Sequence, residues 1–202
     1  MRRTVDLAIA IPALFILSPS MVLLAVAIRR DSPGPAFYRQ ARVGLDGAPF
    51  TILKFRTMRV SSKAAAFVMG GPDDPRITRL GRLLRRARLD EFPQLVNVVR
   101  GEMTLIGPRA EVPEFVALYT PEQRRVLRVR PGITGPGQLD YATKFEPLLN
   151  GATDPNEVYI NRVLGPKLEI DLEYIRTRTL KGELGILVRT VQLVAGIGRR
   201  GR

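Results

Sequence analysis

Residues 83–95, Leu-Leu-Arg-Arg-Ala-Arg-Leu-Asp-Glu-Phe-Pro-Gln-Leu, join two amphipathic segments and contain an adjacent pair of carboxylates, Asp90 and Glu91. Upstream of the pair, leucines recur at the spacing of one helix face and arginines at the spacing of another. Downstream, an apolar run ends at Gly101, a residue type that terminates many helices. Because Pro93 fits only the first turn of a helix, the spacing predicts that Asp90 caps the second helix.

Two roles for Asp90 follow from this position. The first is a structural cap that accepts backbone N–H bonds and contributes about 1 kcal/mol. The second is a nucleophile or metal ligand, held ionised by the helix N-terminus and by nearby arginines. Local spacing favours the cap, whereas the surplus of arginine around the pair indicates an anionic substrate. Those arginines are Arg85, Arg86, Arg88, Arg100 and Arg109.

The composition limits the chemistry that the chain can perform. Its 202 residues include 32 Lys and Arg against 19 Asp and Glu, which gives a net charge of +13. The length fits one domain with or without an appendage, and the charge suits nucleic acid, phosphorylated substrates or an anionic membrane. Cysteine and histidine are absent from the sequence, which excludes thiolate and imidazole chemistry. A bound metal is therefore expected to be a hard ion held by oxygen, such as Mg²⁺.

The N-terminal segment has the character of a membrane helix. Residues 7–28 carry no charge, and as a straight helix they would extend ~33 Å, about the thickness of a bilayer's hydrocarbon core. Ser18 and Pro19 lie at the middle and predict a kink or break, with serine hydroxyls serving the freed backbone groups. Arginine pairs at positions 2–3 and 29–30 flank the segment and favour the same side of the membrane. We expect a re-entrant helix in preference to its rivals, a straight spanning helix and a cleaved signal peptide.

The remaining chain alternates short strands, glycine-rich turns and helices. Residues 36–40 and 50–58 predict a β-hairpin, in which Lys54 and Arg56 share one side that spacing alone assigns to solvent. The glycine-rich segment at 133–138 could bring backbone N–H groups to a phosphate, although this signal is weak by itself. Helices are expected at 167–179 and 183–197, and the second is amphipathic enough for either a membrane surface or a core.

Taken together, the chain resembles the monotopic phosphoglycosyl transferases, the small single-domain type of the bacterial sugar transferase family. The resemblance implies an α+β, mostly helical fold with a re-entrant membrane helix at residues 1–30. A catalytic domain at residues 31–202 would lie on the cytoplasmic face of the bacterial inner membrane, with amphipathic helices around an interfacial active site. The matching features are Ser18-Pro19, Lys54-Phe55-Arg56-Thr57-Met58, residues 89–94, Gly107-Pro108-Arg109, residues 130–135 and residues 169–187.

The resemblance also implies a two-step reaction that starts polysaccharide or glycoconjugate synthesis. Asp90 would attack the β-phosphate of a UDP-sugar, release UMP and carry the phosphosugar until a polyprenyl phosphate accepts it. Glu91 would be the acidic partner of Asp90, and both would adjoin Mg²⁺, the cofactor of the family. Lys54, Arg85 and Arg109 match family residues that hold the donor.

Three positions depart from the family pattern. Ala110 follows Gly-Pro-Arg where proline is common, which affects the local turn. The segment after residue 135 lacks the arginine of many members, and Lys144 is the candidate replacement. Glu183 stands at the late acidic position, which is often aspartate. The substrate-binding set expected from the resemblance is therefore Lys54, Arg85, Arg109, Lys144 and Glu183.

An alternative from another class is a membrane-tethered basic protein that binds anionic lipid or nucleic acid without catalysis. Asp90 and Glu91 would repel such a ligand, and aromatic residues make up only 6% of the chain, without tryptophan. Among enzymes, the alternative to a transferase is a hydrolase of lipid-linked or nucleotide diphosphates that uses the same carboxylates and Mg²⁺. The expected partners are a UDP-sugar, polyprenyl phosphate and membrane lipid, with a homodimer as a further candidate and without nucleic acid.

Overall fold

The computed structural model describes residues 2–60, 74–149 and 152–194. Most of these residues are helical, as the sequence predicts. The elements are α1 (Arg2–Asp31), β1 (Phe37–Val43), β2 (Pro49–Phe55), α2 (Arg79–Arg86), α3 (Gln94–Arg100), β3 (Thr104–Ile106), α4 (Pro113–Val116), β4 (Gly132–Thr134), α5 (Pro136–Asp140), α6 (Pro155–Val158), α7 (Gly165–Thr177) and α8 (Leu180–Val194).

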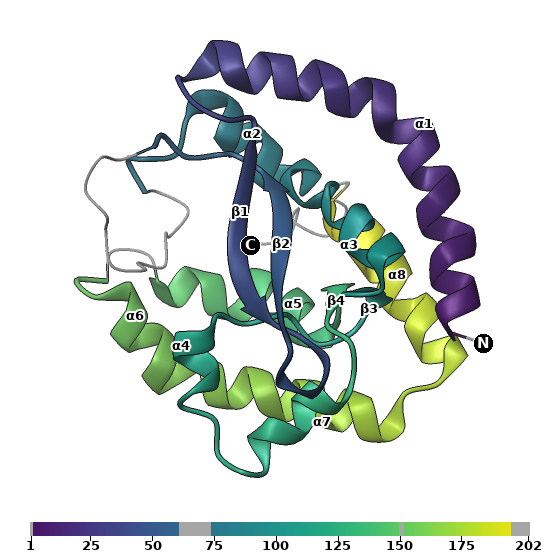
Figure 1. Ribbon diagram of the computed structural model, residues 1–202. Helices are drawn as coiled ribbons and strands as arrows, with labels where there is room; N and C mark the ends of the chain where they lie inside the picture. Colours follow the sequence, from purple (N-terminus) through teal and green to yellow (C-terminus); the bar gives the residue numbers. More distant parts are fainter. Residues whose placement is uncertain (1, 61–73, 150–151, 195–202) are drawn as a thin grey trace.

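The antiparallel pair β1–β2 separates two groups of helices (Figure 1). Helices α4, α6 and α7 lie on one side, where a core forms around Val112, Phe115, Val163 and Leu168. On the other side, α1, α2, α3 and α8 lie together, and apolar residues of α1 and α3 pack against Ile52 of β2. Helix α5 contacts both α7 and α8 and so lies between the two groups. The predicted hairpin is confirmed, with its strands at somewhat different bounds.

A buried asparagine joins the hairpin to α3. The Asn97 side chain is fully buried, and its amide nitrogen donates to the Thr51 carbonyl at 2.8 Å and to Glu102 Oε2 at 2.6 Å. Its Oδ1 accepts from the Leu53 amide at 3.1 Å. Asn97 thereby pairs with the edge of β2 that β1 does not cover, which fixes α3 against the strand.

The sequence predicted a kink or a break at Ser18-Pro19. Helix α1 is continuous from Arg2 to Asp31, so a break is wrong, whereas the helix does bend along its course (Figure 1). Pro19 has no N–H to donate to the Phe15 carbonyl, which is its acceptor in a regular helix. The Ser18 hydroxyl donates to that carbonyl at 2.8 Å, and the Ser20 hydroxyl donates to Leu17 O at 2.7 Å. The predicted role of the serines is therefore confirmed, and it explains how the helix continues through a proline.

The start of α1 is bound to the rest of the domain. Arg3 donates to the Val98 carbonyl and, at 2.8 Å, to the Val99 carbonyl, both near the C-terminal end of α3. Asp6 accepts from the Thr104 hydroxyl at 2.7 Å and from the Leu105 amide at 3.1 Å. A buried aspartate in an apolar helix is thus satisfied by β3.

The end of α1 is bound to the same domain by Arg56. Its guanidinium donates to the carbonyls of Ile28 at 3.3 Å, Ser32 at 2.6 Å and Pro33 at 2.6 Å. Only 6% of Arg56 is exposed, so the prediction that it lies on a solvated side of the hairpin is wrong. The reason is that carbonyl groups at the end of α1 and in the turn after it lack partners within the helix, and the long Arg56 side chain reaches them from the hairpin.

Large apolar side chains of α1 and α8 remain exposed. Within the described residues, α1 is the one helix long and apolar enough to cross a membrane, and Phe15 is 82% exposed. Helix α8 buries Ile186 but exposes a row of apolar residues, which favours the membrane-surface interpretation of this helix over the core interpretation. The exposed row consists of Leu180, Leu184, Val188, Val191 and Val194.

We predict that Asn97→Ala lowers the free energy of unfolding by about 2–4 kcal/mol, because it leaves a strand amide and a carbonyl without partners. Equilibrium denaturation in detergent, followed by circular dichroism, measures the effect. Asn161→Ala, at an exposed position, is the matched control and should change stability by less than about 0.5 kcal/mol. Equal stability of the two variants would show that Asn97 does not hold the hairpin.

Candidate active site

The carboxylate pair lies in a tight turn between α2 and α3. Arg88 has a φ of 56°, a left-handed conformation, and residues Leu89–Glu91 form a 3-10 turn. Helix α3 starts at Gln94 with Pro93 before it, and Asp90 makes no capping bond. The prediction that Asp90 caps α3 is therefore wrong, because the left-handed residue turns the chain before the helix begins.

Glu91 is buried among three cationic side chains. Its Oε1 lies 2.8 Å from Lys54 Nζ and 3.1 Å from an Arg109 nitrogen, and its Oε2 lies 3.9 Å from Arg88. Burial alone would raise the pKa of Glu91, but the charges of Lys54, Arg109 and Arg88 outweigh burial and hold the pKa well below its usual range. Glu91 is consequently ionised, and positive charge exceeds negative charge around it.

Asp90 is buried beside this cluster with one oxygen unused. It is 8% exposed, and its Oδ1 has no hydrogen-bond partner in the part of the chain that the structure describes. Burial and the charge of Glu91 raise its pKa, while Lys54, Arg85 and Arg88 act in the opposite direction. Arg85 is anchored nearby, since its Nε donates to the Thr57 hydroxyl at 2.8 Å. A buried carboxylate oxygen without a partner is costly and often functional.

Arg109 is presented by a turn that two backbone segments lock in place. The Gly107 amide donates to the Thr134 carbonyl at 2.9 Å, and the Gly132 amide donates to the Pro108 carbonyl at 2.8 Å. A Cβ on Gly132 would lie 2.1 Å from the Gly107 nitrogen, so only glycine permits this approach. A Cβ on Gly135 would likewise lie 2.2 Å from the Gly107 carbonyl oxygen. The glycine-rich segment at 133–138 therefore packs against the Arg109 turn, whereas the sequence suggested a phosphate contact.

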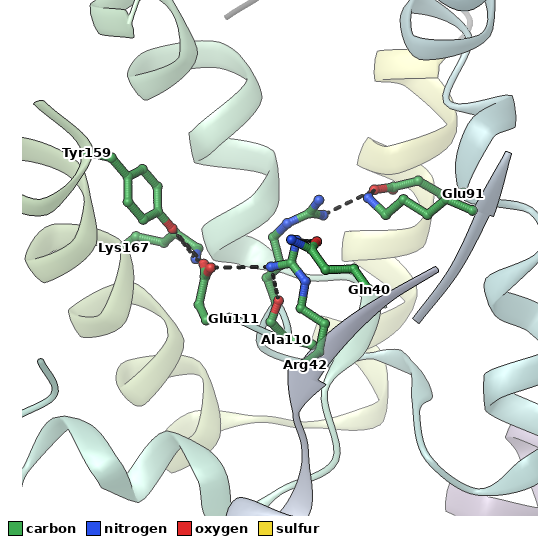
Figure 2. Close-up of polar contacts among 9 residues, drawn as sticks. Gln40, Arg42, Glu91, Ala110, Glu111, Tyr159 and Lys167 are labelled. Carbon is green, nitrogen blue, oxygen red and sulfur yellow. Dashed lines mark hydrogen bonds and ion pairs between the residues drawn. The ribbon is translucent and has the colours of Figure 1, made fainter. Parts of the chain in front are cut away.

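A second buried cluster supports the same turn and was missed by the sequence reasoning. Glu111 accepts from Lys167 and, at 2.5 Å, from the Tyr159 hydroxyl, and it lies 3.6 Å from Arg42 (Figure 2). Arg42 also donates to the Ala110 carbonyl at 3.0 Å. The partners are 48 to 69 positions from Glu111 in the sequence, so no local pattern could have revealed them. The cluster fixes the segment that follows Arg109.

An apolar cavity of about 220 Å³ opens beside Glu91 and Arg88. Its walls come from α1, α3, α5 and α8, with residues of β3 and β4 between them. Apart from Arg88, Glu91, Thr134, Gln138 and Thr190, the lining is apolar: Leu17, Phe92, Leu95, Leu105, Ile133, Leu139, Leu187, Leu193 and Val194. Two charged side chains together with largely hydrocarbon walls suit an amphiphilic ligand.

Comparison with known proteins identifies the family. A sequence model described as "Bacterial sugar transferase" matches residues 1–196. The chain belongs to the bacterial sugar transferase family. Among similar proteins, a UDP-glucose:undecaprenyl-phosphate glucose-1-phosphate transferase of Caulobacter vibrioides is 38% identical over 94% of this chain and 68% of its own length.

Other relatives of this sugar transferase are longer. An Escherichia coli protein with the same name is 36% identical over 95% of this chain but only 39% of its own length. A UDP-N-acetylgalactosamine-undecaprenyl-phosphate N-acetylgalactosaminephosphotransferase of Aeromonas hydrophila is 35% identical over 98% of this chain and 45% of its own length. The chain thus spans less than half the length of these two relatives.

In the sugar transferase, the residues predicted to form the site fall into two groups. Lys54, Asp90, Glu91 and Arg109 are brought together, and the charge of Arg85, which Thr57 anchors, acts on Asp90. Lys144 is exposed and pairs with Asp140 at 2.8 Å. Glu183 pairs with Arg2 at 3.1 Å and accepts from the Tyr174 hydroxyl, in a different cleft. Substrate-binding roles for Lys144 and Glu183 stay predictions.

We predict that Lys167→Met lowers the free energy of unfolding by about 3–5 kcal/mol, because it removes a buried partner of Glu111. Glu111→Gln should also lower the free energy of unfolding, since it leaves the buried charges of Lys167 and Arg42 without a carboxylate partner. Combining the two should cost at least about 1 kcal/mol less than the sum of the singles. Additive losses in denaturant titrations would contradict the buried cluster.

Proposed function

We propose that this sugar transferase moves a sugar 1-phosphate from a UDP-sugar to a polyprenyl phosphate, as the first membrane step of polysaccharide or glycoconjugate synthesis. The observation that carries the proposal is the unpaired Oδ1 of buried Asp90 beside a surplus of cations. The names of the relatives provide the substrate classes, undecaprenyl phosphate and UDP-sugars. Those names include both glucose and N-acetylgalactosamine, so the proposed donor is a UDP-sugar without a choice between these sugars.

In the first step, an Asp90 oxygen forms a bond to the β-phosphorus of the donor. The bond from that phosphorus to the bridging oxygen breaks, and UMP leaves with the electron pair. In the second step, a phosphate oxygen of the acceptor attacks the same phosphorus and returns Asp90 to a free carboxylate. Each displacement needs an aligned nucleophile and positive charge around the phosphoryl oxygens more than it needs a base.

The cations that hold Glu91 are suited to stabilise the transferred phosphoryl group. Arg109 and Lys54 share one oxygen of Glu91, so each retains donors that face away from this contact. Arg85, anchored by Thr57, extends the positive charge on the side of Asp90. The guanidinium groups of Arg85 and Arg109 offer two parallel N–H donors to phosphate oxygens, which lysine cannot do.

Asp90 and Glu91 also fit a magnesium ion. Mg²⁺ is commonly held by one or two carboxylates together with phosphate oxygens and water. Asp90 has a free oxygen for this purpose, and Glu91 is adjacent. The described residues contain no group of three or more acidic side chains that could hold a metal ion. When bound, the ion would neutralise charge on the donor phosphates.

The apolar cavity beside Glu91 is the proposed place for the isoprenoid chain of the acceptor. Its charged end is formed by Arg88 and Glu91, where the acceptor phosphate would meet the phosphosugar on Asp90. Leu17, near the middle of α1, lines the same cavity. A lipid held there would be in contact with the helix that enters the membrane.

The contacts of α1 support a re-entrant topology on the cytoplasmic face. Arg3 and Asp6 bind α3 and β3, and Arg56 binds the turn that follows the helix. A bilayer core is about 30 Å thick, and one domain that contacts both ends of the helix is most easily placed on one side of it. Basic residues at both ends favour the cytoplasmic side.

We predict that Asp90→Asn abolishes UMP release from a UDP-sugar, because an amide is a poor nucleophile of nearly the same shape. Release is measured with the purified full chain, a panel of UDP-sugars, Mg²⁺ and polyprenyl phosphate. With donor alone, mass spectrometry of the wild type should find a phosphosugar on the peptide that contains Asp90. Asp46→Asn, at an exposed position in the hairpin turn, is the matched control and should remain active.

Two results would overturn this proposal. Sizeable activity in Asp90→Asn would exclude Asp90 as the nucleophile. UMP and sugar phosphate formed at full rate without any lipid acceptor would indicate a hydrolase. A chain that only binds anionic lipid or nucleic acid would release no UMP, and its binding would fall steeply with added salt.

We predict that the start of α1 stays on the cytoplasmic side. The chain has no cysteine, so Thr4→Cys, at an exposed position, introduces a single label site. A membrane-impermeant maleimide added to spheroplasts should not label it, whereas permeabilised cells should be labelled. Adding Ser18→Ala and Pro19→Leu straightens the helix and should increase labelling from outside. Labelling of Thr4→Cys alone in intact spheroplasts would rule out the re-entrant topology.

A further inference from the structure

A second cleft, of about 260 Å³, lies under the start of α1 and carries an excess of positive charge. It is enclosed by α1, β3, the start of α8 and the 3-10 segment η3 (Gln123–Arg128). Five arginines and only two carboxylates line it, namely Arg2, Arg3, Arg128, Arg130, Arg178, Asp6 and Glu183. We propose that this cleft binds the phosphate of an anionic phospholipid.

Most of the charged groups in the cleft already have protein partners. Both oxygens of Asp6 accept hydrogen bonds from β3, and Glu183 is paired with Arg2 at 3.1 Å. Arg3 donates to carbonyls at the end of α3, and Arg130 Nε donates to the Gly101 carbonyl at 2.8 Å. The acidic residues are therefore satisfied, while no carboxylate in the described part of the chain neutralises the guanidinium charge of Arg3 and Arg130.

Arg128 and Arg178 are different, because their guanidinium groups are free. Both are exposed, and neither makes a hydrogen bond or ion pair with any residue that the structure describes. They come from η3 and from the residue after α7, and they line one cleft. Two free guanidinium groups beside further positive charge suit the oxygens of a phosphodiester.

The remaining walls distinguish a lipid from other phosphates. Val5, Ile9, Leu180 and Leu187 supply hydrocarbon surface, and the first two belong to the helix that is apolar enough to enter a membrane. An acyl chain would lie on this surface, whereas inorganic phosphate would leave it unused. The lining contains no aromatic side chain on which a base could stack, which disfavours nucleic acid. A phosphate next to hydrocarbon is the chemistry of a phospholipid at a headgroup boundary.

Native mass spectrometry of the detergent-solubilised full chain tests the proposal, with dioctanoyl phosphatidylglycerol as the probe. The double variant Arg128→Gln/Arg178→Gln removes the two free guanidinium groups without breaking a side-chain hydrogen bond or ion pair among the described residues. Arg124→Gln/Arg162→Gln is the matched control, since it changes the net charge equally at two exposed arginines outside the cleft. The assay uses neither donor nor acceptor, so its result does not depend on the proposed activity.

The wild type and the control should bind one phosphatidylglycerol with equal affinity, and the cleft variant should bind it about thirtyfold more weakly. Dioctanoyl phosphatidylcholine, which has no net charge, should bind more weakly than phosphatidylglycerol to the wild type. Equal affinity of the cleft variant and the control would overturn the proposal. Inorganic phosphate that competes as effectively as the lipid would also overturn it, by showing a simple anion site.

Discussion

The buried charge of Glu91 is the constraint on which the rest of the site depends. A carboxylate removed from water destabilises the fold by several kcal/mol unless cations and hydrogen bonds replace its hydration. Here the cations arrive from separate parts of the chain: Lys54 from β2, Arg88 from the turn before Glu91, and Arg109 from the turn after β3. Satisfying one carboxylate thus requires the hairpin, α2, α3 and the β3–β4 pair to be assembled correctly.

The buried charge of Glu111 has the same need for partners, and Glu111 belongs to the same short segment as Arg109. Arg109 faces Glu91, and Glu111, two positions later, faces Lys167, Tyr159 and Arg42. The segment between them is held from both sides, which leaves Arg109 little freedom to move. A rigid arrangement of cations suits the transfer of a phosphoryl group, because the cations need little reorganisation to stabilise the negative charge of the transition state. Stability and the proposed catalysis therefore draw on the same contacts.

The sequence predicted features that depend on short stretches of chain. Alternating residues and a glycine turn indicated the hairpin, and Gly101 indicated the end of α3. The serines beside Pro19 indicated which side chains would bond to the backbone groups of α1 that the proline leaves without a partner. The failures have tertiary causes. Asp90 does not cap α3 because Arg88 takes a left-handed conformation, which is rare for residues other than glycine.

Arg56 and the Glu111 cluster were not predicted because their contacts join residues that lie far apart in the sequence. Arg56 donates to carbonyls 23 to 28 positions earlier, and Lys167 reaches Glu111 from 56 positions later. Periodicity has no means of reporting such pairs, because it describes only which side of an element a residue occupies. Recognition of the carboxylate block and the Gly-Pro-Arg turn identified the centre of the site without these supports.

The docking of α1 has a consequence for the order in which the protein is made. Arg3 and Asp6 bind groups that lie 95 to 99 positions later in the chain. Because synthesis runs from the N-terminus, an apolar helix emerges from the ribosome well before its partners on α3 and β3 exist. During that interval the helix depends on a membrane or a chaperone to cover it. The contacts that hold the start of α1 in place can form only after translation has passed residue 105.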